Sequence, residues 1–171
     1  MSEPVLTAQD ALKWLENTST NWQKLLSANP DILPISCDIA GSVTVAQLLQ
    51  HIVAVELRYA ERIARLPETD YNKVPFGTVD AIYATHNRAL AIYHQALAAD
   101  LDWDQTIDFV TRTYGPASAS RKTIFFHAMF HGIRHYAQLG TLIRQHGYTT
   151  DWPTDYLVMG MTLLSDSGKL K

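Results

Sequence analysis

The segment that decides the fold covers residues 121–146 and reads RKTIFFHAMFHGIRHYAQLGTLIRQH. Its apolar residues recur at helical spacing, and Gly147 follows as a residue type that commonly ends a helix. Within the segment, His127, His131 and His135 are spaced by four. A step of four residues leaves side chains only about 40° apart around an α-helix, so these three imidazoles share one stripe. The segment therefore predicts a long helix with a histidine face.

Three further helices are predicted from the apolar spacing and from the glycine and proline residues that separate the segments. They run from about Ala8 to Ala28, from about Thr44 to Arg65, and from Thr78 to about Ala99. Thr7 and Thr78 are the expected N-caps, and Thr44 with Gln47 has the pattern of a capping box. Four long amphipathic helices predict an all-α fold, a four-helix bundle.

Two segments outside these helices have weaker patterns. Residues 100–118 are mixed, and alternation around Ile107 and Phe109 fits a short extended arm or hairpin. A short additional C-terminal helix is expected over Tyr156 to Leu164. Because no linker, repeat or low-complexity tract interrupts the sequence, residues 1–171 are expected to form a single domain.

Composition and charge exclude several classes of protein. Hydrophobic residues make up 47% of the chain and charged residues 18%, as in ordinary globular proteins. The net charge is -3 and the 14 Lys and Arg residues are scattered, so no surface for nucleic acid or an anionic membrane is expected. No stretch approaches the roughly 20 apolar residues of a membrane span, and the acidic N-terminal segment is unlike a signal peptide. The single cysteine, Cys37, is expected to be buried, and the cytoplasm is the expected location.

The histidine face predicts a metal site. Imidazoles in an apolar seam need polar partners, because unpaired buried polar groups are costly, and one ion can serve several rings. An H-x-x-x-H pair on one helix can chelate Zn, Ni, Cu or Fe, but a third ligand must come from another helix. His51, within TVAQLLQHIVAVELRY, is the best candidate, whereas the polar neighbours of His86 and His94 favour a partly exposed face. The alternative is that all these histidines are ordinary core or surface residues.

Two stretches, TVAQLLQHIVAVE at residues 44–56 and HAMFHGIRHYAQL at residues 127–139, resemble the DinB superfamily, which includes YfiT-like metal-dependent enzymes. The resemblance extends over nearly the whole chain. It implies a four-helix bundle of uncommon connectivity that binds one divalent ion through His51, His131 and His135. Zinc or nickel is expected first, with iron or manganese as alternatives. The late family motif has His, Arg and Gly where this chain has Arg134, Tyr136 and Ala137.

The resemblance also implies a function, a metal-dependent enzyme of the thiol-dependent transferase or hydrolase type. Its substrate would be a small molecule, for which a low-molecular-weight thiol is one candidate. Gln138 would orient a ligand or the substrate, and Tyr59 or His127 could relay protons. His127 is also a candidate fourth ligand. Arg58 and Arg62 either hold a carboxylate substrate or are solvated arginines at a helix end. The alternative function is a non-catalytic metal-binding or stress-response protein.

A homodimer is expected as well. Four Trp and eight Tyr give the chain more aromatic area than a short core covers, and members of the superfamily are often dimeric.

Overall fold

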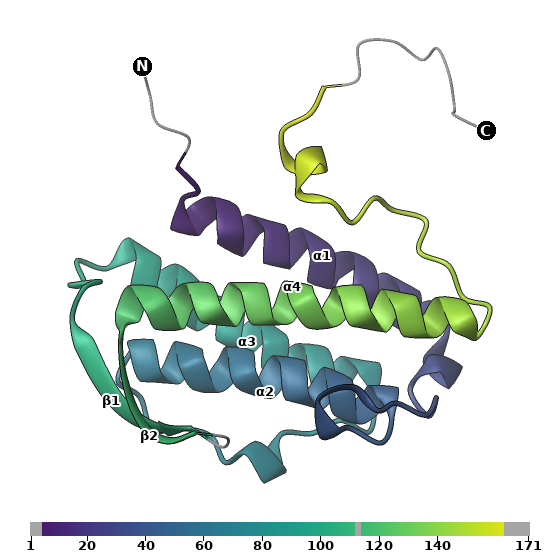
Figure 1. Ribbon diagram of the computed structural model, residues 1–171, viewed down its shortest axis with the longest axis horizontal. Helices are drawn as coiled ribbons and strands as arrows, with labels where there is room; N and C mark the ends of the chain where they lie inside the picture. Colours follow the sequence, from purple (N-terminus) through teal and green to yellow (C-terminus); the bar gives the residue numbers. More distant parts are fainter. Residues whose placement is uncertain (1–4, 112–113, 163–171) are drawn as a thin grey trace.

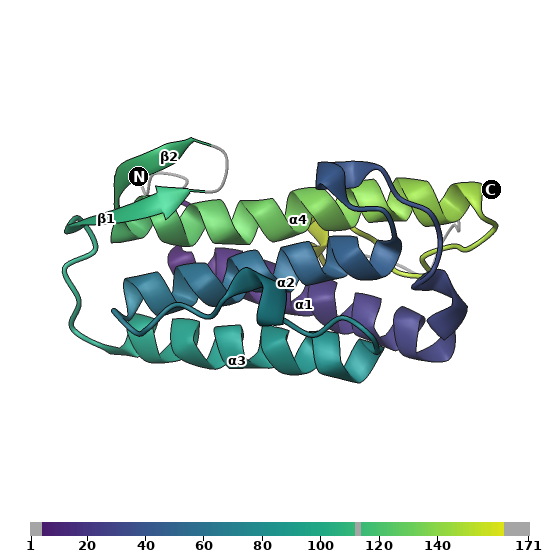
Figure 2. The same ribbon diagram turned by 90° about the horizontal axis from the view of Figure 1, so that it is seen from below.

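The computed structural model describes residues 5–111 and 114–162. Four long helices form most of it, as expected: α1 (Ala8–Ala28), α2 (Val45–Ile63), α3 (Val79–Ala98) and α4 (Arg121–Gln145). They lie side by side along their lengths (Figure 1). Helices α1 and α2 each contact both α3 and α4, and the view in Figure 2 shows α1 behind α2. The chain therefore crosses the structure diagonally between α1 and α2 and again between α3 and α4.

The predicted caps begin the helices. Thr7 and Asp10 form a reciprocal capping box at α1, in which the Thr7 hydroxyl accepts from the Asp10 backbone N–H at 3.1 Å. At α2, the Thr44 hydroxyl accepts from the Gln47 N–H at 3.3 Å. The Gln47 side chain, however, accepts from the N–H of Val43 and not from that of Thr44, so the expected box is displaced by one residue.

A two-stranded antiparallel sheet joins α3 to α4, so the all-α expectation is wrong in this respect. Strand β1 (Thr106–Thr111) pairs with β2 (Gly115–Ser120), with Thr106 opposite Ser120 and Thr111 opposite Gly115. The alternation in the sequence accounts for strand β1, because Ile107 and Phe109 turn toward the helices while their neighbours face solvent. The hairpin lies beside the first half of α4 (Figure 1), which places it over one end of the α2–α4 contact.

The expected C-terminal helix is wrong in extent. The chain forms only a short 3₁₀ turn over Tyr156–Met159, and residues 160–162 are not helical. Leu163 and Leu164 lie outside the described residues. Gly160 follows the turn directly and is a poor helix former, which accounts for the early end. The turn packs on α1, where the ring of Tyr156 meets that of Trp14 edge to face at 5.1 Å.

The core lies between the four helices and contains much of the aromatic area. The largest buried side chains include Trp22, Tyr83, Tyr93, Phe125 and Tyr136. All four tryptophans are buried or half-buried, whereas Tyr114 and Tyr156 are exposed, and the homodimer stays a prediction. Cys37 is buried, as expected. In the described part of the chain, every helix is too short or too polar to cross a lipid bilayer.

Glycine is required at one point of close helix approach. A Cβ atom on Gly132 would lie 2.8 Å from the Leu15 side chain and 3.1 Å from the Glu56 carboxylate. Helix α4 therefore approaches α1 and α2 closely at the position next to His131. This approach brings the histidine face of α4 against α2.

Candidate metal centre

Two neighbouring helices bring the three predicted ligands together. His51 lies on α2, and His131 and His135 lie one helical turn apart on α4. One ring nitrogen from each histidine lies within 4.8 Å of the other two. The ring centroids of His131 and His135 are 4.4 Å apart, and that of His51 lies 4.8 Å and 5.1 Å from them. The predicted convergence of the three histidines is therefore observed.

Hydrogen bonds fix how two of these rings present their nitrogens. His135 Nε2 lies 3.2 Å from Arg134 Nη2, and because a guanidinium can only donate, this nitrogen carries a lone pair. His135 Nδ1 then bears the proton and donates to Gln138 Oε1 at 2.7 Å. The Nε2 atoms of His51 and His131 are 3.0 Å apart, so one of them carries a proton that it donates to the lone pair of the other. The three rings thus offer one converging nitrogen each.

Burial and mutual repulsion disfavour the charged forms of His131 and His135. Burial lowers the pKa of His131 to about 2, and the positive charges that His135, His51, His127 and Arg134 would carry lower it further. Burial also lowers the pKa of His135, despite the opposing effect of Gln138. Neutral imidazoles are the form that binds a metal ion. The lowered pKa values therefore leave His131 and His135 in the ligating form at neutral pH.

The three histidines open onto a cavity of about 700 Å³ between α2, α4 and the hairpin. All the site residues predicted from the sequence line this cavity, namely His51, Tyr59, His127, His131, His135 and Gln138. Phe109 and Val110 of β1 cover one side. Among the described residues that line the cavity, none is Asp or Glu. The cavity thus combines nitrogen ligands, aromatic rings and positive charge.

His127 and Tyr59 lie beside the convergent histidines. The His127 ring is 5.6 Å from the His131 ring, and the Tyr59 ring meets it edge to face at 5.2 Å. Burial, followed by the charge of Arg134, lowers the pKa of His127. His127 is not one of the three residues whose nitrogens converge. Its position suits contact with a substrate better than ligation.

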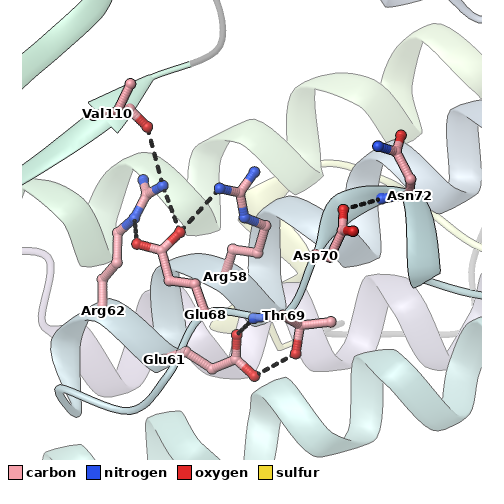
Figure 3. Close-up of polar contacts among 8 residues, drawn as sticks. All are labelled: Arg58, Glu61, Arg62, Glu68, Thr69, Asp70, Asn72 and Val110. Atoms are coloured by element: carbon pink, nitrogen blue, oxygen red, sulfur yellow. Dashed lines mark hydrogen bonds and ion pairs between the residues drawn. The ribbon is translucent and has the colours of Figure 1, made fainter.

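Arg58 and Arg62 have a partner that the sequence did not suggest. Both bind the carboxylate of Glu68, with Arg58 Nη2 at 2.9 Å and Arg62 Nε at 2.6 Å (Figure 3). Arg62 is buried, with its guanidinium 4.8 Å from the Tyr59 ring centre and 4.6 Å from that of Phe109. The interpretation of Arg62 as a solvated arginine is therefore wrong, because its side chain is buried. Arg58 and Arg62 share one carboxylate and both line the cavity, so their contact with a substrate carboxylate stays a prediction.

The α2–α3 connection adds Tyr71, which sequence reasoning missed. Its hydroxyl lies 3.4 Å from His51 Nδ1. The connection is attached to α2 by Glu68 and by Glu61, whose carboxylate accepts from the backbone and the hydroxyl of Thr69 (Figure 3). No periodic pattern marks such a loop residue, so only the folded chain reveals this contact.

The expectation of a partly exposed His86 is wrong. His86 is 2% exposed, its Nδ1 lies 2.6 Å from Glu56 Oε2, and its Nε2 lies 2.7 Å from Ser19 Oγ. His94, two turns later, does face solvent beside Glu16. His146 is the C-cap of α4 and is exposed, as expected for a histidine at a helix end.

Residues 1–162 match the family model described as the DinB family. The chain belongs to the DinB family. The crystal structure of a DinB-like protein from Bacillus cereus ATCC 10987 has a similar fold, with a TM-score of 0.53 and 20% sequence identity over 81% of this chain and 95% of that one. The chain matches no curated protein sequence. Membership of the DinB family therefore accounts for the fold, while the chemistry of this DinB-family chain has to be argued from its own site.

Proposed function

We propose that the chain binds one divalent metal ion through His51, His131 and His135 and uses it as an enzyme on a small molecule. The observation that carries the proposal is the convergence of three ring nitrogens, one from each histidine, within 4.8 Å of one another at the wall of an open cavity. Two nitrogens that bind the same zinc ion at about 2.0–2.1 Å lie at most about 4.2 Å apart. The three nitrogens, within 4.8 Å of one another, lie close to that range.

The donor set indicates the kind of metal. Three imidazoles suit zinc or nickel, whereas carboxylate oxygens are typical of manganese and calcium sites. The lining residues that the structure describes offer no carboxylate. Zinc or nickel is therefore proposed first, with iron and manganese less favoured. Gln138 would hold the His135 ring in the tautomer that leaves Nε2 free.

The open cavity supports an enzyme over the non-catalytic alternative. Structural zinc sites are closed by four protein ligands, whereas catalytic sites have three and leave a position open. Within the described residues, the convergent set contains three side chains. When bound, such an ion acts as a Lewis acid and lowers the pKa of a water or thiol ligand. Hydrolysis and transfer of a low-molecular-weight thiol are thus the two proposed reaction types.

Two side chains are placed to handle protons in either reaction. His127 has a lowered pKa and reaches the cavity one turn before His131 on α4. A neutral imidazole can accept a proton from a nucleophile and later donate it to a leaving group. Tyr59 contacts the His127 ring from α2 and lines the same cavity. We assign His127 as the proposed acid–base residue and Tyr59 as its neighbour in positioning the substrate.

Metal analysis of the purified protein tests the proposal. Elemental analysis after dialysis against zinc is expected to give about one ion per chain, and His51→Ala, His131→Ala and His135→Ala are expected to lose it. His94→Ala and His146→Ala, both exposed, are the matched controls and are expected to retain it. His127→Ala is expected to keep the metal but to lose turnover in a screen of thiol and ester substrates. Equal metal content in all these variants would exclude the site.

A further inference from the structure

Arg134 differs from the two other arginines that line the cavity. Arg58 and Arg62 are both paired with Glu68. Within residues 5–111 and 114–162, no carboxylate forms an ion pair with Arg134, whose side chain is exposed and lines the cavity beside His135. Its guanidinium thus keeps its full positive charge at the mouth of the site.

The charge of Arg134 acts directly on the candidate metal centre. Arg134 Nη2 lies 3.2 Å from His135 Nε2, and its side chain lines the same cavity as the three histidines. Because no acidic residue lines the cavity within the described chain, nothing there offsets this charge. An anion entering the cavity would meet a favourable field, and a bound divalent ion would strengthen it.

The contact of Arg134 with His135 also involves the atom that would bind the metal. Arg134 Nη2 donates to the His135 Nε2 lone pair at 3.2 Å. A metal ion and a guanidinium cannot both use that lone pair, and their positive charges repel. Binding of the ion therefore releases Arg134, which stays tethered beside the cavity with all its N–H donors available.

We propose that Arg134 is the anion-binding residue of this pocket and that the substrate carries a carboxylate close to the group that reacts. One unpaired guanidinium matches a carboxylate, because its planar fork donates two parallel hydrogen bonds to the two oxygens. Arg134 occupies His135 Nε2 in the metal-free protein and exchanges that contact for the substrate anion once the ion is bound. This inference rests on the proposed metal site and adds the substrate class to it.

The first test is zinc affinity, measured by competition with a chromophoric chelator. Arg134→Gln removes a cation that competes for His135 and is expected to bind zinc roughly three- to tenfold more tightly than the wild type. Arg144→Gln is the matched control, because Arg144 is an exposed arginine of the same helix that does not line the cavity. It is expected to leave zinc affinity unchanged.

The second test is anion binding to the cobalt-loaded protein, followed through the visible cobalt spectrum. Acetate is expected to bind wild-type protein and Arg144→Gln alike, and Arg134→Gln about tenfold more weakly. Acetamide, the neutral analogue of acetate, is expected to bind weakly to all three proteins. Inorganic phosphate is titrated in parallel, and an Arg134-dependent preference for phosphate over acetate would overturn the carboxylate assignment.

The outcomes separate this inference from the metal proposal. If zinc binds but Arg134→Gln and Arg144→Gln have the same zinc and acetate affinities, the role of Arg134 is wrong and the metal site stands. If the wild-type protein binds neither zinc nor cobalt, the metal site fails and the inference fails with it. Thermal unfolding of both variants is expected to match the wild type in the absence of metal, since both side chains are exposed.

Discussion

Histidines lie between the helices of this protein in two sites with opposite surroundings. One is the buried group of His86, Glu56 and Ser19, and the other is the group of His51, His131 and His135. His86 uses both ring nitrogens within the core, one toward the Glu56 carboxylate and one toward the Ser19 hydroxyl. The Nε2 atoms of His51 and His131 instead lie 3.0 Å apart at the wall of an open cavity that no described carboxylate lines. A histidine whose polar groups are all paired stabilises the fold. Histidines that face one another compete for a proton, and a metal ion can replace that proton.

The buried group has the composition of a nucleophilic triad but not its properties. Ser19 is 1% exposed, so a substrate cannot reach its hydroxyl. The hydroxyl also lies 3.0 Å from the Glu16 carbonyl oxygen, which can only accept its proton. His86 Nε2 lies 2.7 Å from the same hydroxyl, inside the core. The comparison shows that accessibility decides the role of a histidine, and not the residue types around it.

The largest expected effect separates the two groups by stability. His86→Ala leaves the Glu56 carboxylate buried and unpaired, which is expected to lower the free energy of unfolding by about 3–5 kcal/mol. Zinc stoichiometry of the folded variant is expected to stay at the wild-type value. Urea unfolding and elemental analysis measure both quantities, with His94→Ala, at a surface pair, expected to lose at most about 1 kcal/mol. Loss of zinc from a folded His86→Ala variant would contradict the assignment of His86 to stability and of the other group to metal binding.

The second prediction concerns stabilisation by the ion. At a free zinc concentration one hundred times the dissociation constant, zinc is expected to raise the free energy of unfolding of the wild type by about 2.7 kcal/mol, because it binds the folded state only. His131→Ala is expected to lose this increment. The measurement is urea unfolding with and without zinc. An equal increment in both proteins would place the ion elsewhere.

The third prediction concerns pH and the metal-free protein. The pKa of His131 is lowered to about 2 in the folded state, against about 6.5 in the unfolded chain. Below about pH 6.5 the unfolded chain therefore binds more protons, so stability is complete above that pH and declines as the pH falls toward the folded value. This histidine gives a slope of at most about 1.4 kcal/mol per pH unit. Urea unfolding across this range checks it, and His131→Gln is expected to flatten the slope.

The smallest expected effect concerns Gln138, the hydrogen-bond partner of His135, compared with Glu56, the partner of His86. Gln138→Ala removes an exposed amide from His135, which is expected to weaken zinc binding about tenfold and to change stability little. Chelator competition and thermal unfolding measure the two effects. A large loss of stability with unchanged zinc affinity would make Gln138 structural, like Glu56.

The helices and the histidine stripe follow from the sequence alone, because both depend on local physics. Apolar spacing and the Thr caps set the helix bounds to within a few residues, and the spacing of His131 and His135 places them on one face. The hairpin was foreseen only in part. The alternation at Ile107 and Phe109 was visible and predicted an extended arm or a hairpin. The partner strand, β2, has little apolar alternation of its own, so the sequence did not decide between the two.

The tertiary structure decided which histidines meet. His86 has polar neighbours in the sequence, yet Asn87 and Arg88 point to solvent while His86 points inward, since successive residues on a helix lie about 100° apart. Which face is inward depends on the neighbouring helices and cannot be derived from adjacent residues. The same holds for His51, which meets His131 only because α2 packs against α4.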